Sequence, residues 1–167
     1  MLTIFLRIPQ CFKSFAWYSL CFIFLLIFYW HPRIFSLKHE LVTGAAGYIG
    51  ASFSYEALKK GFRVYGCDNF INSDETNIKI LESKFPNDFI FEKIDLSTEL
   101  EKVKNFISNK QIECVIHFAS LKSFEESEKI PNEYWRNNLD STFNVLKAME
   151  DEGLKALVFS SSASVYG

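Results

Sequence analysis

A glycine-rich turn between two apolar segments constrains the fold of this chain more than any other feature of its sequence. Residues 42–50 read Val-Thr-Gly-Ala-Ala-Gly-Tyr-Ile-Gly, which spaces Gly44, Gly47 and Gly50 three apart. This spacing is typical of a dinucleotide-binding turn: the first glycine permits a tight turn, the second lets a pyrophosphate approach the backbone, and the third lets the next helix pack closely. The free N–H groups at the start of that helix would bind the phosphates.

An acidic residue follows the turn at the distance that such a site requires. Asp68 comes directly after a second apolar segment, residues 62–67, and lies eighteen positions after Gly50. A carboxylate there can accept hydrogen bonds from the adenosine ribose hydroxyls, and no arginine follows at once to bind a 2′-phosphate, so NAD is favoured over NADP. The alternative, a glycine-rich surface loop, does not explain why strand, turn, helix, strand and acid come in this order.

Strand and helix patterns alternate through the rest of the chain. The 167 residues leave room for one domain of ordinary size. The alternation predicts an α/β fold with a doubly wound parallel sheet, a Rossmann-type NAD-binding domain over residues 39–167 that is incomplete at its C-terminus. Predicted helices cover residues 48–60, 75–85, 98–110 and 132–152, and predicted strands after the first cover residues 62–67, 89–94, 114–119 and 154–160.

The first 38 residues form a hydrophobic leader of different character. Residues 14–30 carry no charge and are rich in aromatic and aliphatic side chains, and seventeen residues is the lower limit for a membrane-spanning helix. Three interpretations stay open: a single-pass anchor, a cleaved signal peptide, which lacks a small-x-small cleavage site here, and translated upstream or intronic sequence. We expect a cytoplasmic protein if the leader is not authentic, and a membrane-anchored one if it is.

Glu40 conflicts with a buried first strand. Such a strand is covered on both faces and should be almost wholly apolar, yet this carboxylate lies only four residues before Gly44. Burying it unpaired would cost several kcal/mol. Either the strand has only two or three residues, or Glu40 lies at its exposed start, or the join between leader and domain is not authentic.

Charge and cysteine content argue against two classes of site. A formal net charge of −2 provides no basic field, so we expect no nucleic-acid partner. The four cysteines show no C-x-x-C spacing and do not cluster with the three histidines, so we expect neither a metal site nor a disulfide framework. We interpret them as free thiols in a reducing compartment.

Four segments occur together, in order, along the second part of the chain. They read Thr-Gly-x-x-Gly-Tyr-Ile-Gly at residues 43–50, Asp-Asn-Phe-Ile-Asn-Ser at 68–73, His-Phe-Ala-Ser-Leu-Lys at 117–122 and Ser-Ser-Ser-Ala-Ser-Val-Tyr-Gly at 160–167. Together they resemble the UDP-glucose 4-epimerase family of extended short-chain dehydrogenase/reductases. The likeness covers residues 41–167 and leaves the leader outside it.

The resemblance implies a bound NAD that removes hydride from carbon 4 of a UDP-sugar and returns it to the opposite face, which interconverts UDP-glucose and UDP-galactose. It also implies that Tyr48 and Ile49 contact the pyrophosphate, and that the hydroxyl of Ser162 polarises the oxygen on carbon 4. The other implied cofactor-binding residues are Asp68, Asn69, Phe70, Ile71, Asn72 and Ser73 at the adenosine ribose, Asp95 and Leu96 at the adenine, and Phe118, Ala119, Ser120, Leu121, Lys122 and Asn137 along the cofactor.

The resemblance further implies a Tyr-x-x-x-Lys pair after the serine motif, and none follows it in this chain, since Tyr166 precedes only Gly167. We therefore expect an inactive fragment of an epimerase, which would take a UDP-sugar substrate at full length and form a homodimer through the helix predicted at 132–152. One alternative is a non-catalytic, membrane-tethered NAD-binding module. Another, disfavoured by Leu121 and Lys122, is a membrane-anchored sugar-nucleotide decarboxylase.

Overall fold

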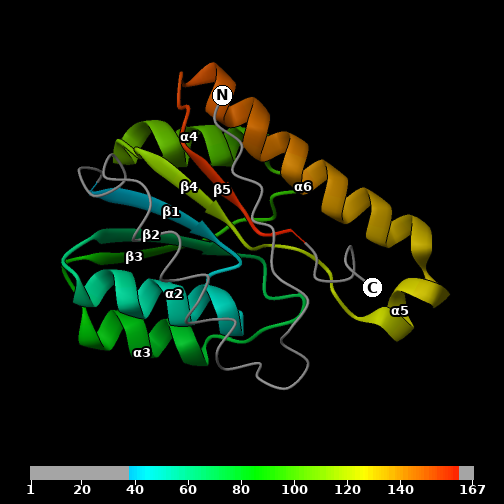
Figure 1. The fold of residues 1–167 in the computed structure, drawn as a ribbon, viewed down its shortest axis with the longest axis horizontal. Helices are drawn as coiled ribbons and strands as arrows, with labels where there is room; N and C mark the ends of the chain where they lie inside the picture. The colour runs from blue at the N-terminus through cyan, green and yellow to red at the C-terminus, as the bar shows by residue number, and fades with distance from the viewer. Residues whose placement is uncertain (1–37, 162–167) are drawn as a thin grey trace, which may run out of the picture.

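A parallel sheet forms the centre of the computed structural model, which describes residues 38–161 (Figure 1). Its strands lie in the order β3-β2-β1-β4-β5, and every neighbouring pair is parallel. This order confirms the predicted doubly wound sheet. The strands are β1 (His39–Thr43), β2 (Arg63–Asp68), β3 (Phe89–Lys93), β4 (Cys114–His117) and β5 (Leu157–Phe159).

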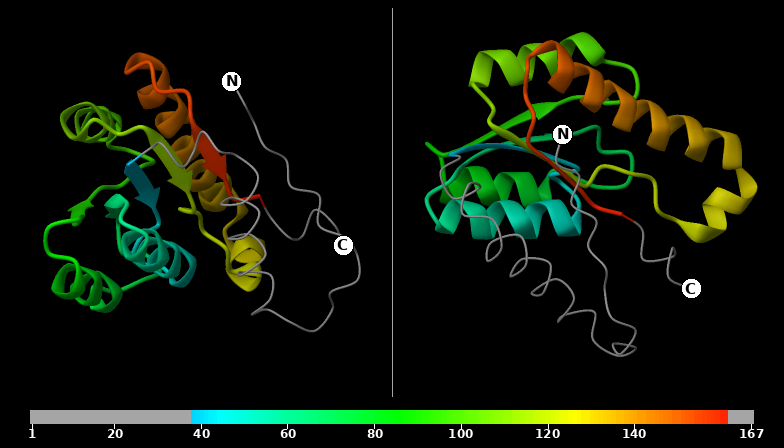
Figure 2. Two further views of the ribbon diagram at one scale, coloured as in Figure 1. Left: turned by 60° about the vertical axis from the view of Figure 1, so that its left-hand side comes forward. Right: turned by 45° about the horizontal axis from the view of Figure 1, so that its top comes forward.

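Helices cover both faces of the sheet (Figure 2). On one face lie α2 (Tyr48–Lys59) and α3 (Thr76–Lys84), and on the other lie α4 (Leu100–Lys110) and α6 (Pro131–Asp151). Each matches a predicted helix with ends moved by a few residues. The short helix α5 (Phe124–Lys129) lies beyond the carboxyl end of β4 and leads directly into α6.

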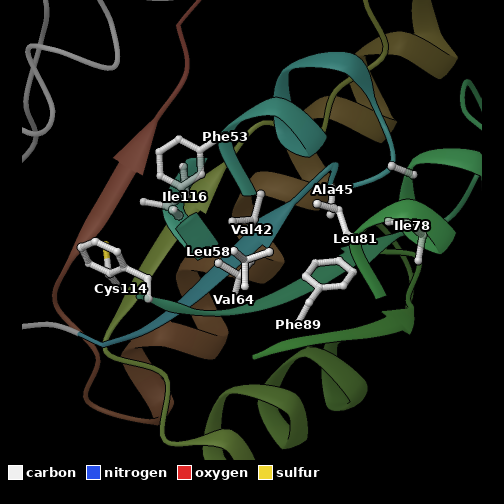
Figure 3. Packing of buried hydrophobic residues seen from close by; sticks show 13 residues of the cluster. Val42, Ala45, Phe53, Leu58, Val64, Ile78, Leu81, Phe89, Cys114 and Ile116 are labelled. Carbon is white, nitrogen blue, oxygen red and sulfur yellow. The ribbon is translucent and has the colours of Figure 1, made fainter. Parts of the chain in front are cut away.

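The core consists of two apolar layers because successive residues of a strand point to opposite faces. Val42 packs toward α2 and α3, whereas its neighbour Leu41 packs toward α4 and α6. Figure 3 shows the first layer, in which Val42 and Ile116 of adjacent strands lie near Phe53 of α2. Both faces of the central strands are therefore buried, and the sheet is held in one register against two sets of helices.

Glu40 lies inside this core, contrary to two of the explanations offered for it. The first strand has five residues, and Glu40 is its second residue, with 1% of its surface exposed. Its Oε2 atom has no hydrogen-bond partner, and burial raises the pKa of the carboxyl from about 4.5 to about 7. The strand is longer than the carboxylate suggested because β1 pairs along its length with β2 and β4.

The cysteines of the described region are buried free thiols. Burial raises the pKa of Cys114 to about 12 and raises that of Cys67 still further, so neither forms a reactive thiolate near neutral pH. Cys11 and Cys21 lie outside the described residues.

Within residues 38–161, no helix is both long enough and apolar enough to cross a bilayer, and no set of His, Cys, Asp and Glu side chains is placed to hold a metal ion. The predicted span at residues 14–30 lies outside the described part of the chain.

We expect replacement of the buried carboxylate, Glu40→Val, to raise the free energy of unfolding by about 3 kcal/mol at pH 8. The raised pKa means that the folded state retains a proton that the unfolded chain loses near pH 4.5, so the stability of the unaltered protein falls as the pH rises from 4.5 to 7. The gain should therefore be roughly 2 kcal/mol larger at pH 8 than at pH 5 in urea titrations. Glu92→Val, at an exposed position of β3, is the matched control. An equal gain at both pH values would contradict the burial of an ionisable Glu40.

Candidate functional site

The two central strands of the sheet, β1 and β4, separate the chain into halves that continue in opposite directions. After β1 the chain passes to α2 on one face, and after β4 it passes to α5 and α6 on the other. A crevice at such a switch point, outside the carboxyl ends of the strands, is where ligands bind in open α/β sheets. A groove of about 860 Å³ lies there, lined by the loops that follow β1, β2, β3, β4 and β5.

The glycine turn closes one side of the groove by direct backbone contact. Gly44 has φ of 68°, and a Cβ on it would lie 2.9 Å from the backbone nitrogen of Ala119. A Cβ on Gly50 would lie 2.1 Å from the carbonyl oxygen of Gly44, so α2 begins in close contact with the turn. Around Gly47 the space is open, with only the Gly44 oxygen at 3.4 Å. The middle glycine is thus the one that leaves room for a ligand at the N-terminus of α2.

Asp68, at the end of β2, fastens its own loop to this turn. One carboxylate oxygen, Oδ2, accepts the backbone N–H of Ala46 at 3.1 Å. The other, Oδ1, accepts the N–H of Phe70 at 2.9 Å and the hydroxyl of Ser73 at 3.1 Å. A carboxylate has about four acceptor positions, so Oδ2 retains capacity for a hydroxyl donated from the groove.

The loop after β3 is shaped by a second aspartate. Oδ1 of Asp95 accepts both the N–H and the hydroxyl of Ser97, at 2.9 and 2.6 Å. The side-chain amide of Asn144, on α6, donates to the carbonyl oxygens of Leu96 and Ser97 at 2.8 and 3.0 Å. These bonds hold one end of the groove in place against α6.

The same helix holds the loop after β4. Asn138 brackets Leu121, accepting its N–H at 2.8 Å and donating to its carbonyl oxygen at 3.0 Å. The hydroxyl of Tyr134 accepts the N–H of Ser123 and donates to Glu126 at 2.6 Å. Burial and the bond to Glu126 raise the pKa of Tyr134, which therefore remains a donor near neutral pH.

The structure gathers most of the predicted cofactor-binding residues around one groove. Phe70 differs, because its ring packs on Phe91 with centroids 5.3 Å apart instead of lining the groove. Ser162 lies outside the described residues, although Ser160 and Ser161 line the groove. The predicted residues that line it are Gly44, Gly47, Tyr48, Ile49, Gly50, Asp68, Asn69, Ile71, Asn72, Ser73, Asp95, Leu96, Phe118, Ala119, Ser120, Leu121, Lys122 and Asn137.

Sequence reasoning missed the α6 side chains that hold the loops. The pair Asn137-Asn138 is a visible signal: Asn137 lines the groove, as the resemblance implies, whereas the residue that brackets Leu121 is Asn138. No sequence pattern near Asn144 or Tyr134 indicates their roles, because their hydrogen-bond partners lie in loops outside α6.

One Tyr-x-x-x-Lys spacing does occur in the described region, at Tyr55 and Lys59 of α2. The ring of Tyr55 packs edge-on against Phe85, with centroids 5.7 Å apart, and Lys59 lies 5.5 Å from that ring. Neither residue lines the groove, so this pair is part of the packing between α2 and α3.

Comparison with known proteins identifies the family to which the chain is similar. Residues 40–167 match the NAD dependent epimerase/dehydratase family. The chain is 43% identical over 127 residues to the UDP-glucose 4-epimerase of Bacillus subtilis, covering 76% of this chain and 37% of that protein. It is 41% identical over 129 residues to a UDP-glucose 4-epimerase of Schizosaccharomyces pombe, covering 76% and 36%.

The solved structures to which the chain is similar are also UDP-glucose 4-epimerases. The UDP-glucose 4-epimerase of Stenotrophomonas maltophila, with bound NAD and formylated UDP-arabinopyranose, superposes with a TM-score of 0.73 at 37% identity, over 78% of this chain and 38% of that one. The Bifidobacterium longum enzyme, in complex with NAD⁺ and UDP, gives 0.73 at 37% identity, over 77% and 38%. The chain thus spans less than two fifths of the length of these relatives.

Proposed function

This chain belongs to the NAD dependent epimerase/dehydratase family, and from this membership and the geometry of its groove we propose that it forms the NAD-binding part of a UDP-glucose 4-epimerase. The observation that carries the proposal is the meeting of three loops at one switch point: the glycine turn, the Asp68 loop and residues 118–122. Bound NAD would supply the hydride acceptor and donor of the epimerisation.

The residues present fit a dinucleotide. The open space at Gly47, together with the unpaired N–H groups of the first turn of α2, suits the pyrophosphate. The remaining acceptor capacity of Asp68 suits the adenosine ribose hydroxyls. The loop at Asp95 and Leu96 suits the adenine, and residues 118–122 with Asn137 suit the remainder of the cofactor.

We expect the Asp68→Asn variant to bind NAD about tenfold more weakly and to lose the preference for NAD over NADP. A carboxylate can accept ribose hydroxyls through two charged oxygens and repels a 2′-phosphate, whereas an amide has one uncharged acceptor oxygen and does not repel the phosphate. Isothermal titration with each cofactor measures both affinities. Disturbance of the loop alone would weaken both cofactors equally, so an unchanged NAD-to-NADP ratio would contradict the assigned role of Asp68.

We propose that the sugar chemistry follows that of the relatives. The Bifidobacterium longum enzyme was solved in complex with NAD⁺ and UDP, and we infer a UDP-sugar substrate for this chain, beside the loop after β5 that lines the groove. Ser162 would polarise the oxygen on carbon 4 by hydrogen bonding. A hydroxyl alone does not act as a base, so the proposed role of Ser162 is hydrogen bonding and not proton abstraction.

A chimera tests the proposed activity. Residues 40–167 would replace the matching segment of the Bacillus subtilis enzyme, which is 43% identical over the aligned region. We expect the chimera to interconvert UDP-glucose and UDP-galactose, and the same chimera with Ser162→Ala to lose about 10²-fold or more in kcat. A folded, NAD-binding chimera that leaves both sugars unchanged would refute the assignment to this reaction.

We propose a homodimer through α6. Trp135, Leu139 and Phe143 follow one another at four-residue spacing and are 66, 43 and 60% exposed, which places an apolar stripe on the outside of the helix. We expect Leu139→Glu to shift the protein toward monomer in sedimentation velocity runs. Ile80→Glu, at a similarly exposed apolar position of α3, is the matched control and should leave the oligomeric state unchanged. A wild-type protein that sediments as a monomer would contradict the dimer.

A further inference from the structure

A buried histidine connects the two sides of the groove. His117, the last residue of β4, is 2% exposed, and its ring stacks on Phe159 with centroids 5.6 Å apart. Its Nδ1 atom lies 2.8 Å from the hydroxyl of Thr43 at the end of β1, and its Nε2 atom lies 3.3 Å from the hydroxyl of Thr142 on α6. The imidazole therefore bridges two strands and a helix.

The partners of Thr43 determine the direction of the first hydrogen bond. Its Oγ1 accepts the backbone N–H groups of Phe118 and Ala119, both at 3.2 Å, and the Phe118 N–H is shared with the carbonyl oxygen of Thr43 at 3.3 Å. A hydroxyl has two lone pairs and one proton, so with both lone pairs occupied it donates its proton to Nδ1 of His117. Nδ1 must then carry no proton.

The other side of the ring follows from this assignment. A neutral imidazole without a proton on Nδ1 carries it on Nε2, which donates to Thr142. The hydroxyl of Thr142 in turn donates to the carbonyl oxygen of Asn138 at 2.8 Å. Burial lowers the pKa of His117 to about 4, which agrees with a neutral ring near pH 7.

Both ends of this series of hydrogen bonds, at Thr43 and at Asn138, contact the loop after β4. Thr43 holds the N–H groups of residues 118 and 119, while Asn138 holds both backbone groups of Leu121. We propose that His117 is a positioning residue which, as its Nε2–H tautomer, orders residues 118–122 along the groove. The effect of His117 on cofactor binding rests on the function proposed above, but its effect on the order of the loop does not.

The tautomer can be read directly from long-range ¹H–¹⁵N correlation spectra of the unaltered chain near pH 7. We expect a proton on Nε2 of His117 and none on Nδ1. His39 is an internal control with the opposite requirement, because its Nδ1 lies 3.2 Å from the carbonyl oxygen of Lys110, which can only accept a hydrogen bond. A proton on Nδ1 of His117 would overturn the proposal.

Two variants test the effect on the loop. His117→Asn keeps a carbonyl oxygen near the position of Nδ1 and can still accept from Thr43, whereas His117→Phe fills the space without accepting. We expect amide hydrogen exchange at Phe118 and Ala119 to become about tenfold faster in His117→Phe and to remain close to wild type in His117→Asn. The amide of Tyr65, in β2, reports any general loss of stability. Equal exchange at the loop amides of all three proteins would refute the positioning role, and if His117→Phe fails to fold, the tautomer decides.

NAD titrations of the same proteins distinguish this inference from the proposed function. We expect His117→Phe to bind NAD about tenfold more weakly than His117→Asn. If wild-type protein binds no NAD, the proposed function fails, while the tautomer and the exchange rates still decide the role of His117.

Discussion

Close backbone contact between the loops after β1 and β4 is the constraint on which the rest of the site depends. A Cβ on Gly44 would lie 2.9 Å from the nitrogen of Ala119, so only glycine permits this approach. Thr43, one residue earlier, accepts two N–H groups from the opposite loop. Because these loops belong to the strands at which the chain reverses direction, their contact closes one side of the groove and lets both halves of the domain contribute to one binding surface.

Much of the fold was predictable because its signals are local. Short apolar segments between helical patterns predict the strands, and the glycine turn predicts the start of α2. The helical spacing of Leu100, Val103, Phe106 and Ile107 predicts α4. Two of the three explanations offered for Glu40, a shorter strand and an exposed strand start, were wrong for the opposite reason. A single charged residue carries a strong local preference for solvent, but β1 pairs with β2 over all its residues and with β4 from Glu40 onward, which outweighs that preference.

The residues of the site likewise include some that the sequence predicts and some that it does not. Residues that line the groove follow strand ends, and a strand end can be located from sequence. The residues that hold those loops cannot be found in this way. Asn138 bonds to a residue seventeen positions away, and Asn144 to residues 48 and 47 positions away, so nothing near either asparagine in the sequence reveals its partner. Phe70 was predicted at the ribose as part of a motif, yet its ring turns toward Phe91.

Helix α6 fixes a distance as well as two contacts. Asn138 forms hydrogen bonds to the loop after β4, and Asn144 forms hydrogen bonds to the loop after β3. Six residues of α-helix separate these two positions by about 9 Å along the axis. Two of the loops that line the groove are therefore held by one helix. Insertion of one residue between the two asparagines would rotate one side chain by about 100° relative to the other about the helix axis. The length of this helical segment can therefore vary far less than that of an ordinary surface helix.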